Sequence, residues 1–385
     1  MNIRKNWIIY ITIIFIAIIG IFAFFIFPKI QRSKVSNTAT TLGETIKQKE
    51  RTIKKDIEDV DTMWELAELY SRIDRDYERA QELLDTILNK EPDHELAMHL
   101  KGVVLTEQGK FIEAIDQFNS LLAMDENDPV TLQNLSKLYF IFDIDRSLNY
   151  AKEAVEAAIW QYRQDSEYDY SPVFNEWEQA IQNFDIEFQI DPAIAVLNME
   201  EFFMAEPTLL IEVYKFALDM LENTSLDNAK NLLERAGLLY TEIGNNEEAV
   251  DIYRKLTEIS PEYGKGYVLL SNRLAKVDRL DELADIMERL KSQDKMIVEK
   301  NIIDILMQYE KGETKEAMER LEIMNVDEYN IFIAHNMGIL YETLGKKDDA
   351  IRCYNRALGY SDEDYDFWQA INHETTKAVL YLDSK

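Results

Sequence analysis

One sequence motif occurs three times in this chain, and its spacing limits the folds that the chain can adopt. The copies read LTEQGKFIEAIDQFNSLLAMDEN, LYTEIGNNEEAVDIYRKLTEISP and LYETLGKKDDAIRCYNRAL. Their glycines, Gly109, Gly244 and Gly345, are separated by 135 (244 − 109) and 101 (345 − 244) residues. Both spacings fall just short of a multiple of about 34 residues, and a fixed period of that size is typical of a helical repeat array.

The third copy shows why the motif predicts a pair of helices. Gly345 can adopt the left-handed backbone conformation that ends a helix. Asp348 and Asp349 follow it, and acidic residues favour the positive end of the next helix. Ala350 is small enough for two helices to approach closely there, and Tyr354 follows on the same face at helical spacing.

Extending this register divides residues 61–364 into about nine units and predicts an all-α fold. Matches to one pattern of small and aromatic positions occur at Met337, Gly338, Tyr341, Gly345, Ala350, Tyr354 and Ala357, at Leu233, Ala236, Gly237, Tyr240, Gly244, Ala249, Tyr253, Leu256 and Pro261, at Trp64, Ala67, Tyr77, Ala80 and Pro92, and at Gly102, Gly109, Ala114 and Phe118. This pattern resembles the tetratricopeptide repeat (TPR) family.

The units are not equally regular. Two well-matched blocks, 61–160 and 230–364, flank a stretch at 161–229 that we interpret as degenerate repeats or a hinge. In 161–194 the second helix is recognisable but the first half is not, and in 195–229 the small residues are missing. Residues 365–385 are predicted to be a capping helix and tail, because an open array end would leave an apolar face in water.

The resemblance implies a curved solenoid that binds a protein partner on its concave face. The first helix of each pair lines that face in this family. The predicted groove residues are Asn231, Glu234, Leu238, Lys265, Val268, Asn272, Phe332, His335, Ile339 and Glu342. Phe332 and Ile339 favour a binding groove over a merely solvated one, because exposed apolar side chains often mark interaction sites.

The N-terminal region predicts a membrane anchor. After the short tail 1–6, residues 7–27 contain no charge and would cover about 30 Å of hydrocarbon as a helix. The long core ending in Phe-Phe-Ile-Phe favours an uncleaved transmembrane helix over a signal peptide. Residues 28–60 are interpreted as a basic tether, flexible at 31–43, and a juxtamembrane helix from Glu44. Basic residues flank the span on both sides, so the side of the cell membrane that the repeats face stays open.

Charge separates the two ends of the chain and limits its partners. Residues 1–60 hold ten Lys/Arg and five Asp/Glu, a balance of +5. Residues 61–385 hold 32 and 67, a balance of −35. Nucleic acid is therefore not expected to bind, and a protein partner with a basic segment is. The alternative is that the acidic surface serves only solubility.

Motifs for chemistry are weak. His94 and His99 are five residues apart, which turns them to different faces of a helix and argues against a shared metal. DEDYD at 362–366 lacks the glycine and glutamate that a calcium loop requires. The single cysteine, Cys353, is expected to be a small core residue. We therefore expect no metal, no cofactor and no catalytic residues, and the protein is not expected to be an enzyme.

Two functions remain open. The first is a single-pass, membrane-anchored scaffold or adaptor that mediates protein–protein interaction at the bilayer surface. The alternative is an extracytoplasmic assembly factor or holdase that acts on exported proteins. A folded, defined partner favours the first function, and broad suppression of aggregation favours the second.

Overall fold

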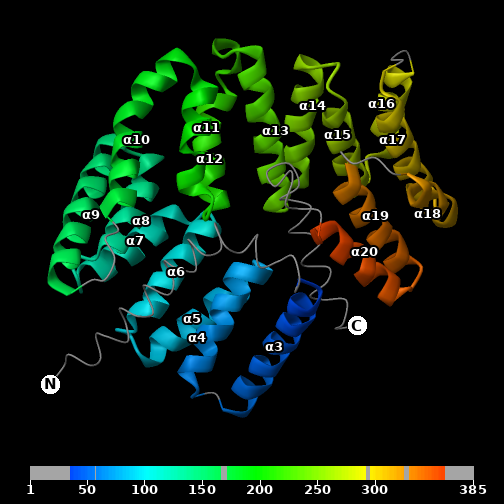
Figure 1. Cartoon of the computed structure of the whole chain (residues 1–385). Helices are drawn as coiled ribbons and strands as arrows, with labels where there is room; N and C mark the ends of the chain where they lie inside the picture. The colour runs from blue at the N-terminus through cyan, green and yellow to red at the C-terminus, as the bar shows by residue number, and fades with distance from the viewer. Residues whose placement is uncertain (1–34, 57, 166–170, 292–294, 325–328, 360–385) are drawn as a thin grey trace. The chain divides into compact units, whose positions relative to one another are not determined.

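The computed structural model (Figure 1) describes residues 35–56, 58–165, 171–291, 295–324 and 329–359. These residues form α-helices with short turns, which confirms the all-α prediction for this part of the chain. The chain divides into two compact units. One is Ile46–Asp304, and the other consists of Met1–Thr45 and Ile305–Lys385.

The helices follow one another in pairs joined by tight turns. Their bounds are α3 Val35–Lys55, α4 Val60–Leu69, η2 Tyr70–Asp74, α5 Tyr77–Lys90, α6 Glu95–Glu107, α7 Phe111–Leu122, α8 Pro129–Phe140, α9 Ile144–Asp165, α10 Ser171–Ile190, α11 Pro192–Phe203, α12 Pro207–Leu218, η3 Leu221–Asn223, α13 Leu226–Glu242, α14 Asn246–Ile259, α15 Gly264–Lys276, α16 Leu280–Leu290, α17 Ile297–Glu310, α18 Thr314–Ile323, α19 Asn330–Thr343 and α20 Lys347–Gly359.

Glycines inside first helices let the two helices of a pair touch. A Cβ added to Gly102 would lie 2.6 Å from the ring of Phe118. At Gly237 the added Cβ would lie 2.3 Å from the ring of Tyr253, and at Gly338 the corresponding distance to the Tyr354 ring is also 2.3 Å. The predicted pairing of small and aromatic positions is therefore confirmed at these contacts, where an aromatic ring packs on bare backbone.

The turns inside the pairs also follow the predicted geometry. Gly109, Gly244 and Gly345 all have positive φ, at 71°, 82° and 70°. Arg75 (φ 52°) takes the equivalent place in the first pair, where left-handed backbone is unfavourable for a residue with a Cβ. Arg75 therefore has to be explained by what its side chain does.

Helix starts obey local capping rules. The carboxylates of Asp59, Asp76, Asp128 and Asp191 accept hydrogen bonds from backbone N–H groups in the first turns of α4, α5, α8 and α11. A proline opens α8, α11 and α12, where the missing N–H costs nothing.

The irregular region differs from a continuous run of nine helix pairs. Unit 161–194 contributes one new helix, α10, because α9 continues to Asp165 and α10 begins only at Ser171. No proline interrupts α9, and Pro172 then falls in the first turn of α10, where it is tolerated. The described array thus has eight pairs and the single helix α10. Residues 171–229 all lie within the Ile46–Asp304 unit, and a hinge there stays a prediction.

The N-terminal expectations are tested only in part. Helix α3 begins at Val35, so the predicted flexible tether at 31–43 is wrong for residues 35–43. Ile46 of α3 is buried in one cluster with Met63, and Ile53 and Val60 pack against that cluster, but Val60 is the first residue of α4 because α3 ends at Lys55. The predicted transmembrane helix at 7–27 and the predicted cap at 365–385 lie outside the described residues. Within those residues, no helix has the length and apolar character that crossing a bilayer requires.

Candidate protein-interaction surfaces

The predicted groove residues do not form one exposed surface. Leu238, Val268, Phe332 and His335 are buried, and Phe332 is only 1% exposed. Asn231 and Glu342 are exposed, and Glu234, Lys265, Asn272 and Ile339 are half-buried. The expectation of exposed apolar anchors is therefore wrong for Phe332.

The cause is that the first helices are enclosed on every side in their middle turns. Six consecutive residues are buried in α13 (236–241) and in α15 (266–271), and eight are buried in α19 (331–338). A run of that length spans more than a helical turn, so it leaves no exposed stripe. Spacing alone could not show this, because it does not say what covers a helix.

Within the Ile46–Asp304 unit, the chain covers its own first helices. Phe140, the last residue of α8, is 1% exposed. The rings of Trp177, Phe184, Phe203 and Phe216 surround it, with centroids 5.0–6.0 Å away. These four rings come from α10, α11 and α12, so the irregular helices supply the cover.

A set of polar contacts, which we call the polar seam, adds to this aromatic contact. The Thr208 hydroxyl lies 2.9 Å from the Glu107 backbone oxygen, to which it donates, and 3.2 Å from Glu107 Oε2. The Tyr77 hydroxyl donates to the same Oε2 over 3.4 Å. Lys137 Nζ lies 3.0 Å from a carboxylate oxygen of Glu206, and both side chains are about 85% buried, with 13% and 14% exposed. The seam therefore joins the ends of α6 and α8 to the start of α12.

Arg75, in the turn before α5, forms a second long-range polar contact, with Glu242 at the end of α13. Its guanidinium donates to Glu242 Oε1 over 2.5 Å, although the two residues are 167 positions apart in the chain. The Glu242 side chain is only 8% exposed. An ion pair this buried compensates a charge that would otherwise be costly, which explains an arginine at a left-handed position.

The pKa of Glu107, an acid of this seam, is strongly raised. Burial, together with the nearby charge of Glu206, raises its pKa to about 8, and the Arg75 charge and hydrogen bonds from Thr208 offset part of the shift. Among the described residues, Glu107 Oε1 is buried and has no hydrogen-bond partner. A pKa raised this far favours the protonated, neutral form of this carboxyl at neutral pH.

A different surface surrounds Asp191, between α10 and α11. Its carboxylate caps α11 and also accepts hydrogen bonds from Thr224, from the backbone N–H of Ser225 at 3.3 Å and from Asn228 Nδ2 at 2.8 Å. Burial raises the pKa of Asp191, but these hydrogen bonds more than offset that effect and lower it overall. Asp191 thus fixes the α10–α11 turn against the start of α13. Exposed aliphatic side chains lie around it: Ile186, Ile190, Ile194 and Leu226.

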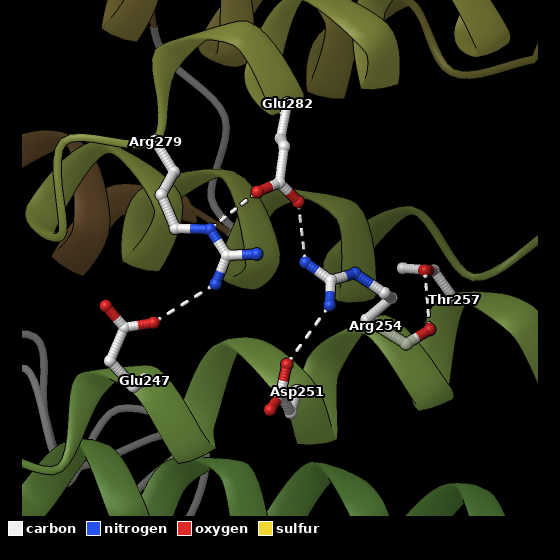
Figure 2. Close-up of polar contacts among 6 residues, drawn as sticks. All are labelled: Glu247, Asp251, Arg254, Thr257, Arg279 and Glu282. Carbon is white, nitrogen blue, oxygen red and sulfur yellow. Dashed lines mark hydrogen bonds and ion pairs between the residues drawn. The ribbon is translucent and has the colours of Figure 1, made fainter.

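An ion network joins residues of α14 to residues at the start of α16 (Figure 2). Arg279 lies between Glu247 (3.1 Å) and Glu282 (2.5 Å), and Arg254 lies between Glu282 (2.6 Å) and Asp251 (3.1 Å). The hydrogen bond from Arg279 is the main reason that the pKa of Glu282 is lowered. The network links α14 to α16 through groups that are partly or mostly exposed, so its contribution to stability is modest, and its three carboxylates and two guanidiniums leave a net charge of −1.

Metal and thiol chemistry receive no support from the described side chains. His94 accepts the N–H of Ala97 and so caps α6, while the ring of His99 contacts Asn134 at 3.2 Å. Within the described ranges, no group of three His, Cys, Asp or Glu could hold a metal ion. Cys353 is 8% exposed, and burial raises the pKa of its thiol.

Sequence reasoning missed Arg75, Glu107 and Glu242. One signal was available for the first of them: Arg75 precedes Ala80 by five residues, as Gly345 precedes Ala350. A non-glycine at that register position indicates that its side chain has a separate role.

Comparison with known proteins identifies the repeat unit. Tetratricopeptide-repeat family models match residues 74–129, 226–263 and 333–364. A TPR repeat-containing protein of Methanocaldococcus jannaschii is 39% identical over 56 residues, which cover 14% of this chain and 17% of that relative.

Two solved structures are similar at 16% identity. They are the P58(IPK) TPR domain, with 85% of this chain and 99% of that chain covered at TM-score 0.26, and a tetratricopeptide repeat protein from Parabacteroides merdae, with 88% and 100% covered at TM-score 0.29. The family matches, together with the helix-pair geometry above, support tetratricopeptide repeats in the three matched segments.

Proposed function

We propose that this protein is a scaffold that binds a protein partner and is held at a membrane by residues 7–27. The observation that carries the scaffold function is the array of tetratricopeptide repeats, which the family models match in three segments. Repeat arrays present extended surfaces to other proteins.

The anchor rests on the 21 uncharged residues of 7–27, and the partner class rests on charge. A body with a balance of −35 attracts basic segments and repels phosphate. The cell membrane is therefore the proposed location, with the repeats on a side that the flanking charges leave open.

Membrane fractionation of the full chain tests the anchor. We expect it to stay in the pellet after washing with 1 M salt and after carbonate at pH 11, because buried apolar surface is not released by screening. A variant lacking residues 7–27 should move to the supernatant. Release of the full chain by salt alone would show that these residues do not span the bilayer.

Affinity capture tests the scaffold. The full chain in nanodiscs should retain a discrete folded partner from its native host, and the partner should elute as salt rises. An aggregation assay with unrelated unfolded proteins distinguishes the alternative, because broad suppression of aggregation would indicate a holdase.

A further inference from the structure

An exposed apolar surface lies where α10 ends and where α11 and α13 begin. Ile186 and Ile190 are 65% and 76% exposed and stand one turn apart on one face of α10. Ile194, in the first turn of α11, is 41% exposed, and Leu226, the first residue of α13, is 59% exposed. Figure 1 places the α10–α11 turn and the start of α13 at the same edge of the array. We call these four residues the Asp191 surface.

This surface is rigid. Asp191 accepts the N–H groups of Ala193 and Ile194 and also the donors from Thr224, Ser225 and Asn228, so one carboxylate fixes two helix starts. Behind it, Phe184 and Ala193 are buried. A preformed surface loses little conformational entropy when a ligand binds, which favours binding.

The charge around it is strongly one-sided. Residues 171–229 contain twelve Asp/Glu and a single Lys. Asp185 and Asp227 are exposed next to Ile186 and Leu226, and no cation among the described residues forms an ion pair with either of them. The surface therefore offers aliphatic anchors flanked by uncompensated negative charge.

The aliphatic side chains and the carboxylates beside them determine which kind of ligand fits the Asp191 surface. A second copy of the chain would bring its own exposed Asp185 and Asp227 against these carboxylates, and an anionic bilayer would be repelled in the same way. We propose that the Asp191 surface binds an amphipathic basic segment of the partner protein, with aliphatic side chains on the isoleucines and Lys or Arg on the flanking carboxylates. This inference rests on the proposed scaffold function and assigns it a site.

A defined peptide tests the assignment without knowledge of the native partner. The probe is a fluorescein-labelled 14-residue amphipathic Leu/Lys helix, and a Leu/Glu helix of the same pattern is the opposite-charge control. Binding is measured by fluorescence anisotropy to the full chain in zwitterionic nanodiscs, with empty nanodiscs as background. We expect Ile186→Ser/Ile190→Ser to weaken binding of the Leu/Lys probe at least about tenfold. Ile112→Ser, at a residue of α7 that is 60% exposed, should leave binding unchanged.

Charge reversal provides a second variant that leaves the apolar anchors in place. Asp185→Lys/Asp227→Lys should weaken the Leu/Lys probe and strengthen the Leu/Glu probe, because the carboxylates set the preference. Both changes are at exposed positions, and an unchanged circular dichroism spectrum confirms folding.

Two results would overturn the inference. Equal binding of the Leu/Lys probe by wild type and both double variants would place the site elsewhere, while the scaffold function would still stand on partner capture. Sedimentation showing a dimer that Ile186→Ser/Ile190→Ser dissociates would make a second copy the occupant. Failure of affinity capture with normal probe binding would instead count against the proposed scaffold.

Discussion

The buried carboxyl of Glu107 makes the stability of this array depend on pH in a direction opposite to that of ordinary acids. Its pKa is raised from 4.5 to about 8 by burial and by Glu206. The folded chain therefore binds one more proton than the unfolded chain between these two values. Glu107→Gln replaces the protonated acid with a neutral group of the same shape, so the variant tests this difference directly.

The sign and size follow from proton linkage. A folded-state pKa above the unfolded value gives a contribution that is complete below pH 4.5 and is lost as pH rises through about 8. The loss is about 1.4 kcal/mol per pH unit well below the folded-state pKa and becomes smaller near it, which gives about 2.3 kcal/mol between pH 6 and pH 8. For roughly 300 ordered residues, an unfolding entropy of about 0.6 kcal/mol/K converts this loss to about 4 °C in Tm.

Thermal melting of the full chain in nanodiscs at pH 6, 7 and 8 measures this contribution. The Tm of Glu107→Gln should fall by about 4 °C less than that of wild type between pH 6 and pH 8. Glu113→Gln, at an exposed position of α7, is the matched control and should keep the wild-type slope. Parallel slopes for wild type and Glu107→Gln would mean that Glu107 is ionised in the folded chain, which would refute the neutral form of this carboxyl.

Three further outcomes follow from individual contacts. Gly237→Ala should destabilise by about 1–3 kcal/mol in denaturant melts, because its Cβ would meet the Tyr253 ring at 2.3 Å, whereas Gly266→Ala, with its nearest contacts at 3.4 Å, should gain up to about 1 kcal/mol. Arg75→Ala should cost about 3–5 kcal/mol by leaving Glu242 buried without its partner, and Arg75→Gly about 1 kcal/mol less because glycine relieves the left-handed strain; a double-mutant cycle with Glu242→Gln measures the pair, and additivity would argue against it. The Cys353 thiol should react with a disulfide reagent only after unfolding, and rapid reaction in the native chain would contradict its burial.

The local parts of the fold could be predicted because they depend on neighbouring residues. The left-handed turns at Gly109, Gly244 and Gly345 follow from register, and so does the contact between Gly338 and Tyr354. Helix α10 could not be predicted as a single helix, because nothing in its own sequence shows that α9 continues to Asp165.

The candidate site was harder to predict, because the exposure of a side chain depends on how segments that are distant in the chain pack together. Phe332 carries the right residue type at a first-helix position, but only the packed structure shows that it is 1% exposed. Ile190 and Ile194 lie on either side of the α10–α11 turn and carry no sequence signal for a site, and the structure leaves both exposed.

The Arg75–Glu242 pair and the Glu107 seam together change where binding should be sought. Glycine would fit the left-handed turn at position 75 with about 1 kcal/mol less strain, so the arginine is unfavourable for that turn by itself. Its guanidinium instead reaches α13, while Glu107 and Lys137 tie α6 and α8 to the start of α12. These contacts hold the first-helix faces of α6 and α8 against the chain itself, so a partner cannot reach them without breaking a buried ion pair. Side chains that the Ile46–Asp304 unit leaves in water, such as Ile190, need no such opening, and a partner is therefore expected to bind there first.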